Sequence, residues 1–356
     1  MSRIRVAGLD FAEFLAEAKT RALPSRGLGA ALYRSVFQTG SFECEEMAPE
    51  SLASWRETFE PGLLEILDIL EEPGEFGVTK KVRFGCPDGL SVESVLIPMP
   101  SRPDTPPRRT LCVSSQIGCR MGCVFCRTGG NGLTRNLEAW EIVAQALTAR
   151  CVLKWEFGNI VFMGMGEPLD NFDSLARALA VLSDQRGPGY AAERITICTS
   201  GIPEGIAKLK SLGYRRMGLS VSLSAADPDL RMSLMPGAAA LASPDELAEA
   251  LAAYPARRNF VLGVNVCLIP GVNDSPEDAR RIAGFCGKIG RCLVNVIPYN
   301  PGENPIARSP SEEETGRFLR ELESLGLKVR ARAAKGSRIM GACGQLAAPG
   351  APRVGA

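Results

Sequence analysis

The sequence predicts an α/β protein built around a parallel sheet, and three observations support this prediction. Short β-rich runs alternate with amphipathic helical stretches over residues 110–332. Such alternation is typical of βαβ units, which form an open sheet or a full or partial barrel. Hydrophobic residues make up 45% and charged residues 23% of the 356 residues, as in globular proteins with a sizeable core. No apolar run reaches the ~18 residues of a membrane span and no signal peptide is evident, so we expect a cytoplasmic protein.

The first third of the chain has a different pattern. We expect helices at 11–22, 28–38 and 61–70, with a further short helix in MAPESLASWRETF. Two β-rich runs at 80–97 flank Asp88 and Gly89, which predicts a β-hairpin. The Pro-rich stretch 98–109 then indicates a domain boundary or linker.

The alternating region gives the expected elements in order. Strands are predicted at 110–114, 159–163, 194–198, 218–223, 260–268, 293–297 and 327–332. Helices are predicted between them at 137–153, 172–182, 203–212, 244–254, 276–289 and 312–325. Ser243-Pro244 and Ser275-Pro276 are typical helix starts, and Gly326 is a typical helix end. Residues 348–356 are expected to be a disordered tail. Chemistry is expected at the C-terminal ends of the strands.

Composition restricts the possible chemistry. The 41 Lys and Arg nearly balance the 40 Asp and Glu, which excludes a protein that grips nucleic acid by bulk positive charge. The chain has 12 Cys and no His. The absence of His excludes Ser-His-Asp catalysis, Cys-His proteases and His-ligated zinc deaminases. In a cytosolic protein, so many Cys favour metal ligands or catalytic thiols over disulfides.

Cys119, Cys123 and Cys126 form a CxxxCxxC motif in the loop after the first strand of the alternating region. Three close thiolates suit an iron–sulfur cluster or zinc. Structural zinc requires four ligands, and no fourth Cys or His lies at zinc-finger spacing. Three Cys leave one iron of a four-iron cluster open to chelate a substrate or cofactor. The alternative is that the three are unrelated small core residues.

With Phe125 before its last Cys, this motif resembles that of the radical S-adenosylmethionine (SAM) superfamily. There the open iron chelates SAM, and electron transfer cleaves SAM to a 5′-deoxyadenosyl radical. Seven motifs in order resemble the RlmN/Cfr family of RNA methyltransferases: TLCVSSQIGC (110–119), GMGEPLDN (164–171), TSG (199–201), SVSLSA (220–225), GVNDS (271–275), NVIPYNP (295–301) and ACGQLA (342–347). The resemblance runs from residue 93 to residue 347.

The resemblance implies an architecture and a set of partners. It implies a partial (β/α)6-type radical SAM barrel at 110–347, a hairpin and linker at 80–109, and a helical accessory domain at 1–79 that binds RNA. It implies one [4Fe-4S] cluster on Cys119, Cys123 and Cys126, and two SAM molecules per turnover. RNA, above all 23S rRNA, is the implied substrate, with flavodoxin or ferredoxin as electron donor, and the chain is expected to be a monomer.

The resemblance also assigns SAM contacts to Gly166, Glu167, Ser222, Leu223, Ser224 and Asn300. Glu167 follows a predicted strand, and a Glu at that end can accept hydrogen bonds from an ammonium group. The alternative is a turn with a solvated Glu. Ser224 stands where the family has His, and Cys198 where it has Ser, so the sequence departs from the family there.

Three further roles come from the family. Cys343 is expected to carry the methyl group as S-methylcysteine, Cys112 to form a transient disulfide with Cys343, and Glu93 to accept the proton from adenine. Read without the family, the two thiols are small core residues and Glu93 is a solvent-facing strand residue. The remaining Cys are interpreted as structural: Cys44, Cys86, Cys151, Cys198, Cys267, Cys286 and Cys292.

The resulting hypothesis is methylation of C2 or C8 of an adenosine in RNA. Candidate RNA contacts are the basic segments 80–83, 108–109, 215–216 and 328–338, and Tyr299 as a stacking residue. Ordinary solvated charge, and a core position for Tyr299, are the alternatives. A different RNA or a small natural product is the second hypothesis. A non-catalytic iron–sulfur RNA-binding protein is the third, and it needs none of Cys112, Cys343 and Glu93.

Overall fold

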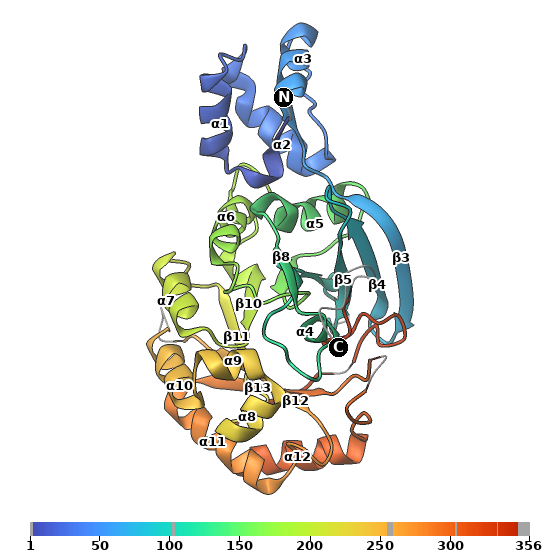
Figure 1. The fold of residues 1–356 in the computed structure, drawn as a ribbon. Coiled ribbons are helices and arrows are strands. Elements are labelled where there is room, and N and C mark those ends of the chain that lie inside the picture. Colours follow the sequence, from blue (N-terminus) through green and yellow to red (C-terminus); the bar gives the residue numbers. More distant parts are fainter. Residues whose placement is uncertain (1–2, 102–103, 255–258, 303–304, 333, 348–356) are drawn as a thin grey trace.

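The computed structural model describes residues 3–101, 104–254, 259–302, 305–332 and 334–347. Its main sheet has ten strands in the order β14-β13-β12-β11-β10-β9-β6-β5-β4-β3 (Figure 1). Seven are parallel: β6 (Arg108–Val113), β9 (Asn159–Phe162), β10 (Ile195–Thr199), β11 (Gly218–Ser222), β12 (Leu262–Leu268), β13 (Cys292–Pro298) and β14 (Val329–Ala331). All seven strands predicted in the alternating region are therefore confirmed. The strand order is linear, so the sheet is a partial barrel rather than a closed one.

Six longer helices connect consecutive parallel strands, as predicted. They are α5 (Ala139–Cys151), α6 (Phe172–Ser183), α7 (Pro203–Ser211), α10 (Pro244–Ala253), α11 (Pro276–Ile289) and α12 (Glu312–Ser324). Ser243 and Ser275 each accept a hydrogen bond from a backbone N–H of the first turn, which confirms both helix starts. The short helices α8 (Pro228–Leu234) and α9 (Pro236–Leu241) lie between β11 and α10 and were not predicted.

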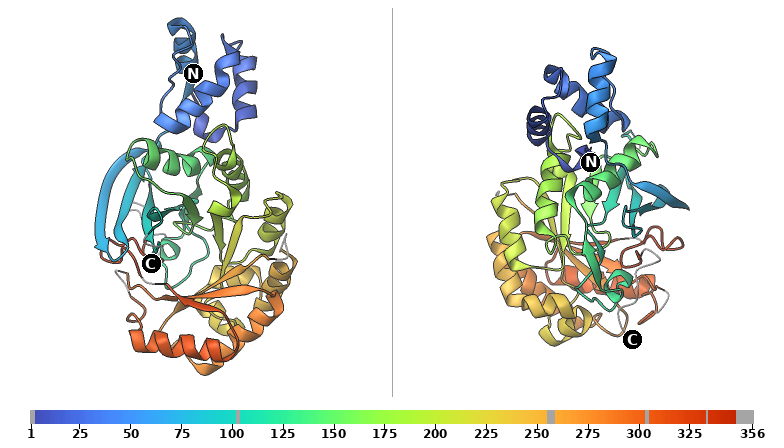
Figure 2. Two further views of the ribbon diagram at one scale, coloured as in Figure 1. Left: turned by 180° about the vertical axis from the view of Figure 1, so that it is seen from behind. Right: turned by 45° about the horizontal axis from the view of Figure 1, so that its top comes forward.

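The two faces of the parallel sheet carry different side chains. Val113, Ile197, Val221 and Val264 point to one face, where they are buried with the apolar sides of the helices. Because side chains alternate along a strand, the neighbouring positions face the other way. The register places Cys198 beside Ser220, and Ser220 beside Gly263, on that second face. The helices thus cover the apolar face (Figure 2), while small and polar groups line the inner face.

The N-terminal region forms a small helical unit beyond the end of the sheet (Figure 1). It contains β1 (Ile4–Arg5), α1 (Phe11–Thr20), α2 (Gly29–Thr39), α3 (Pro49–Thr58) and β2 (Phe59–Glu60). Phe14 packs against the rings of Tyr33, Trp55 and Phe59, with ring centroids 4.8–5.4 Å apart. The predicted helices at 11–22 and 28–38, and the short helix after them, are confirmed.

The helix predicted at 61–70 is wrong. The chain there enters β3 (Glu65–Gly74), which pairs antiparallel with β4 (Gly77–Gly85). The apolar residues of EILDIL fit both a helical pattern and the alternating pattern of a strand. Pairing with β4 favours the strand. The outer edge of β4 offers unpaired backbone groups that β3 satisfies.

The predicted hairpin is confirmed and belongs to the main sheet. β4 pairs antiparallel with β5 (Ser91–Met99), and Gly89 has a φ of +82° in the turn. β5 also pairs antiparallel with β6, so the Pro-rich stretch joins two neighbouring strands of one sheet. Residues 102–103 of that stretch and the predicted disordered tail, 348–356, lie outside the described residues. No helix in the described part of the chain is long and apolar enough to cross a membrane.

Candidate active site

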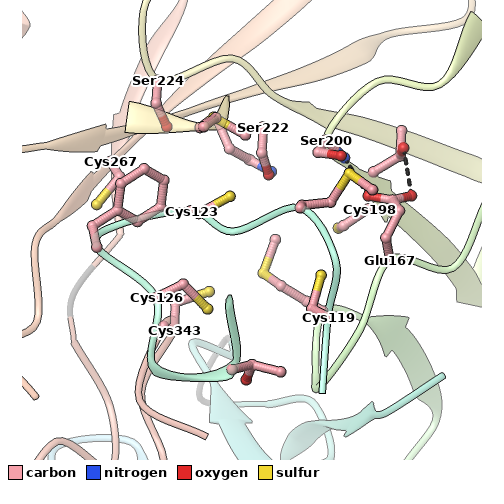
Figure 3. Close-up of a pocket in the computed structure, with 18 of the residues that line it drawn as sticks. Cys119, Cys123, Cys126, Glu167, Cys198, Ser200, Ser222, Ser224, Cys267 and Cys343 are labelled. Atoms are coloured by element: carbon pink, nitrogen blue, oxygen red, sulfur yellow. Dashed lines mark hydrogen bonds between the residues drawn. The ribbon is translucent and has the colours of Figure 1, made fainter. Parts of the chain in front are cut away.

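A cavity opens at the C-terminal ends of the parallel strands, on the inner face of the sheet. Its space measures about 970 Å³ including solvent at its mouth. It is bounded by the ends of β9–β13, by the loop that carries Cys119, Cys123 and Cys126, and by the segment around Cys343 (Figure 3). The structure therefore brings together residues from distant stretches of the sequence.

Cys119, Cys123 and Cys126 all line the cavity, on one loop (Figure 3). Neighbouring backbone fixes this loop, because Val124 N–H donates to Leu234 O at 3.0 Å and Arg127 N–H to Gly344 O at 2.7 Å. Among the described residues, no three His, Cys, Asp or Glu side chains close around a single metal ion. Tetrahedral zinc needs thiolates that converge on one ion. A four-iron cluster is held by thiolates that each bind a different iron, so three thiols spread along the rim of a cavity fit it.

Burial controls the charge of these thiols. Desolvation raises the pKa of Cys119 to about 12 and also raises the pKa of Cys123. The guanidinium of Arg231, on α8, opposes this effect at Cys123. A metal centre supplies the positive charge that thiolates in such an environment need.

Glu167 is buried at the cavity wall. Its Oε1 accepts hydrogen bonds from Thr199 Oγ1 at 2.7 Å and from Leu169 N–H at 3.0 Å, and its Oε2 accepts one from Ser200 N–H at 2.6 Å. Burial raises the pKa of this carboxyl group, while the hydrogen bonds lower it. The interpretation of Glu167 as a solvated turn residue is therefore wrong.

The backbone before Glu167 runs close to the neighbouring strand. Gly166 has a φ of +99°, and a Cβ there would lie 2.5 Å from Gln116 Cβ. A side chain at Gly164 would similarly lie 2.7 Å from Val113 O. Only glycine fits at these two positions, because the backbone packs directly against residues 113–116 there.

Four of the six predicted SAM contacts line the cavity: Gly166, Glu167, Ser222 and Ser224. Leu223 is buried outside the lining, and its N–H donates to Asn265 O at 2.9 Å. Asn300 also lies outside the lining; its Nδ2 donates to Cys343 O at 3.3 Å. Ser224 has a φ of +55°, and Asn273 Nδ2 holds its carbonyl oxygen at 2.8 Å. Asn273, from the GVNDS motif, is thus a supporting residue that pattern reasoning left without a role.

Two buried polar groups on the lining have no hydrogen-bond partner among the described residues. They are Ser200 Oγ and Asn265 Nδ2, and both belong to residues at the cavity wall. A buried polar group without a partner costs free energy, so each indicates a polar ligand at that position. A zwitterionic nucleoside ligand such as SAM fits this donor set and the thiol loop beside it.

Cys343 lies at the cavity mouth and is the only exposed cysteine in the part of the chain that the structure describes. Figure 3 places it beside Cys126. Desolvation by the cavity wall raises the pKa of its thiol to about 11, and the nearby Arg332 opposes that shift. Cys112 is buried on β6 outside the lining, and the proximity of Cys343 and Cys198 contributes to raising its pKa. Cys343 is thus near enough to Cys112 for its charge to influence the Cys112 thiol.

Cys198 and Cys267, which the sequence analysis interprets as structural, lie in β10 and β12. Each lines the cavity (Figure 3). Burial is the main cause that raises the pKa of each thiol, and the proximity of Cys343 adds to it. Both sit near the C-terminal ends of inner-sheet strands, β10 and β12. A position near the C-terminal end of a parallel strand was the sequence signal that could have indicated a place at the site. The sequence alone does not tell which face of the sheet a residue of a buried strand occupies.

Glu93 is buried on β5, so its interpretation as a solvent-facing residue is wrong. Lys81 Nζ lies 3.1 Å from Glu93 Oε1, and Ala347 N–H donates to Glu93 Oε2 at 3.0 Å. The register pairs Val95 with Cys112, and side chains directly opposite share a face. Glu93, two residues before Val95, therefore points to the same face as Cys112.

Several residues of the predicted basic segments have acidic partners. Lys81 is buried, Lys80 pairs with Glu71 and Arg83 with Asp68, while Arg109 pairs with Glu156. Tyr299 is buried in the cavity wall, where its hydroxyl accepts a hydrogen bond from Ile306 N–H at 3.3 Å. Lys81 is thus a site residue rather than a surface contact for RNA.

Comparison with known proteins agrees with this geometry. The model of the radical SAM superfamily matches residues 113–283. The chain is 37% identical over 325 residues to the dual-specificity RNA methyltransferase RlmN of Syntrophobacter fumaroxidans, covering 89% of this chain and 90% of the relative. It is 39% identical to the ribosomal RNA large subunit methyltransferase N of Nitrosopumilus maritimus, covering 79% and 80%.

A solved structure shares the whole fold. The crystal structure of a radical SAM methyltransferase from Sphaerobacter thermophilus superposes with a TM-score of 0.85 at 32% identity, covering 96% of this chain and 98% of that one. Superfamily membership brings a [4Fe-4S] cluster and SAM as cofactors. With its thiol-lined cavity at the strand ends and relatives of 37–39% identity along most of its length, this chain belongs to the RlmN-type family of radical SAM RNA methyltransferases.

Proposed function

We propose that this enzyme methylates C2 or C8 of an adenosine in RNA and that Cys343 carries the methyl group. One observation carries the proposal: the exposed Cys343 lies beside the cysteine loop, with Cys112 near it. Glu93 holds the same C-terminal segment through its hydrogen bond from Ala347. A methyl carrier needs access to the methyl donor, to the substrate and to a second thiol, and the cavity mouth offers all three.

The cofactor assignments follow from the lining. Cys119, Cys123 and Cys126 hold the cluster, and Gly166, Glu167, Ser222 and Ser224 contact SAM directly. Leu223 and Asn300 act from behind the wall, by positioning Asn265 and Cys343 through the hydrogen bonds described above. When bound, the cluster and two SAM molecules per turnover supply the methyl group and the one-electron chemistry that an unactivated adenine carbon requires.

Cys343 acts twice in the proposed sequence. Its thiolate first attacks the methyl group of SAM, so that an S–CH₃ bond forms and S-adenosylhomocysteine leaves. The one-electron chemistry of the bound cofactors would remove one hydrogen atom from the S–CH₃ group, and the methylene carbon on Cys343 then bonds to the adenine carbon. The adduct loses one proton from that carbon and returns one electron to the cofactors, which leaves protein and RNA covalently joined. Arg332 assists the first step because its charge favours the thiolate of Cys343.

Cys112 and Glu93 release the product. The Cys112 thiolate attacks Cys343 Sγ, an S–S bond forms, and the S–CH₂ bond breaks with its electron pair going to the methylene carbon. Glu93 accepts the proton lost from the adenine carbon, and the methylene carbon takes up a proton to become the new methyl group. An external thiol then reduces the disulfide. Both carboxylate oxygens of Glu93 already have partners, Lys81 and the N–H of Ala347. One of these two interactions must therefore break when the adenine enters and Glu93 accepts its proton.

We infer 23S rRNA as the main RNA substrate. Two relatives, a ribosomal RNA large subunit methyltransferase and a dual-specificity RNA methyltransferase, support this inference. The helical unit at residues 3–60, set apart from the sheet, suits a role in RNA binding (Figure 1). We further propose that the enzyme works as a monomer with flavodoxin or ferredoxin as electron donor.

The test is nucleoside mass spectrometry of 23S rRNA and of tRNA from cells with and without the gene. Methyladenosine that disappears from 23S rRNA on deletion, and returns with the wild-type gene, supports the proposal. Digestion to separate C2-methyl and C8-methyl isomers identifies the carbon. An unchanged modification pattern in both RNA classes contradicts the proposal and favours a small-molecule substrate.

A further inference from the structure

Arg231 is a completely buried cation that has no acidic partner. It is 0% exposed, and no Asp or Glu among the described residues forms an ion pair with it. Its fork instead donates to backbone carbonyls, with Nη1 2.5 Å from Leu223 O and Nη2 2.6 Å from Ser200 O. Nε has no hydrogen-bond partner in the described structure. A buried guanidinium in this state lacks the compensating negative charge that such groups normally have.

The place of Arg231 in the fold identifies the missing charge. α8 and α9 pack against the cysteine loop: Val124 N–H bonds to Leu234 O, and Gly237 N–H bonds to Met121 O at 3.0 Å. The carbonyls that accept from Arg231 belong to Ser200 and Leu223, the residues that directly follow β10 and β11. Ser200 lines the cavity, and Leu223 is buried behind the lining. Among the titratable groups that act on Arg231, Cys123 is the one that favours its charged form. The anion that faces Arg231 is therefore the cysteine loop with whatever it holds.

We propose that Arg231 is a positioning residue that sets the reduction potential of the iron–sulfur cluster. The inference rests on the proposed function, because it requires the cluster on Cys119, Cys123 and Cys126. Three thiolates make the site negative, and one-electron reduction adds a further negative charge. A fixed cation in a region of low dielectric constant stabilises the reduced form more than the oxidised form. Arg231 thus makes the cluster easier to reduce, and its hydrogen bonds keep the cation in place.

Arginine suits this role better than lysine does. Its charge persists at physiological pH even where burial lowers its pKa, and its planar fork can bind two carbonyl groups at once. The two carbonyls come from neighbouring strand ends, so the same side chain also aligns the wall on which Ser200 and Ser222 lie (Figure 3).

The experiment is an anaerobic redox titration, followed by electron paramagnetic resonance, on reconstituted full-length protein without SAM or RNA. Arg231→Met removes the charge, Arg231→Lys keeps it, and Arg280→Met is the matched control because Arg280 forms only an exposed pair with Glu277. At a fixed ambient potential we expect Arg231→Met to lower the ratio of reduced to oxidised cluster about tenfold, or ~59 mV for one electron. Arg231→Lys should recover most of this ratio, and Arg280→Met should match the wild type.

Iron content, measured on every sample, separates the two proposals. A wild-type protein that does not hold about four irons contradicts the proposed function rather than the role of Arg231. Arg231→Met with full iron and an unchanged potential overturns the inference. If Arg231→Met does not assemble a cluster, Arg231→Gln replaces it, since its amide can still donate to a carbonyl. If neither neutral variant assembles a cluster but Arg231→Lys does, the result supports the need for a positive charge. If Arg231→Lys also assembles no cluster, the role of Arg231 is purely structural and the inference is overturned.

Discussion

Lys81 and Glu93 form a buried ion pair across the antiparallel strands β4 and β5. The distance from Nζ to Oε1 is 3.1 Å, and the side chains are 8% and 4% exposed. Lys81 Nζ also approaches Met340 O at 3.4 Å, and Glu93 accepts from Ala347 N–H. The pair therefore fastens both ends of the segment that carries Cys343 to the sheet.

Replacing Lys81 should destabilise the protein strongly. Lys81→Met leaves the Glu93 carboxylate buried without its cation, and loss of one partner of a buried pair costs about 3 kcal/mol or more. Lys80→Met is the matched control, because Lys80 pairs with Glu71 in a partly exposed position. We expect that control to change the free energy of unfolding by less than about 1 kcal/mol. Denaturant unfolding measures both, and equal losses in the two variants contradict the buried-pair interpretation.

The two thiols proposed for methyl transfer should fail in different ways. Cys343→Ala should bind SAM but accept no methyl group, so mass spectrometry of the intact protein should show no gain of a methyl mass. Cys112→Ala should still become methylated and add to RNA, because only the release step needs Cys112. It should accumulate as a protein–RNA adduct that survives denaturation in a gel.

Cys86→Ala is the control for both variants, since Cys86 is buried beyond the cavity lining. It should turn over like the wild type. A Cys112→Ala protein that turns over normally without an adduct would mean that another thiol, or another mechanism, releases the product. Cys198 and Cys267 are then the thiols to replace next.

Loss of one cysteine of the loop should abolish the cluster. Cys123→Ala removes a ligand that no other described Cys in the loop can replace, so iron content should fall well below about four per chain and SAM cleavage should stop. Cys286→Ala removes a buried thiol from α11, outside the lining, and should retain full iron. Full SAM cleavage by Cys123→Ala would contradict the assignment of this loop.

Gly166 should tolerate no side chain. In Gly166→Ala the new Cβ meets Gln116 at 2.5 Å, and the φ of +99° is strained for alanine. We expect SAM affinity to fall at least about tenfold, ~1.4 kcal/mol, in an equilibrium binding assay. Gly158→Ala is the control, because a Cβ there has nothing within 4 Å. Equal affinity in the two variants would show that the strand end does not approach SAM.

The sequence predicts the parallel sheet because each strand is short, apolar and followed by an amphipathic helix. The prediction of a helix at 61–70 failed for a physical reason. Leu67, Ile69 and Leu70 of β3 are exposed, so the apolar residues of that segment do not follow the alternation of a strand with one buried face. Only pairing with β4, formed later in the chain, selects a strand.

The cysteine loop was predictable because its three residues are local. The surroundings of Cys343 were not, because they depend on side-chain direction in distant strands. Cys198 and Cys267 look like any core thiol until the register places them on the inner face. Glu93 is recognisable as buried only once Lys81 is known to face it. Arg231 carried no sequence signal, since a lone Arg in a short helix is ordinarily solvent-exposed.

The hydrogen bond between Ala347 and Glu93 joins residues 254 positions apart, and that between Thr128 and Leu346 spans 218. A ribosome makes the chain from its N-terminus, so β3 to β13 and the cysteine loop emerge before this last segment exists. Closing such long loops is slow and comes after the local βαβ units have formed. The enzyme's own assembly therefore delivers the proposed methyl acceptor last, onto a finished sheet, and a chain halted during synthesis before residue 343 holds the cluster motif but lacks that cysteine.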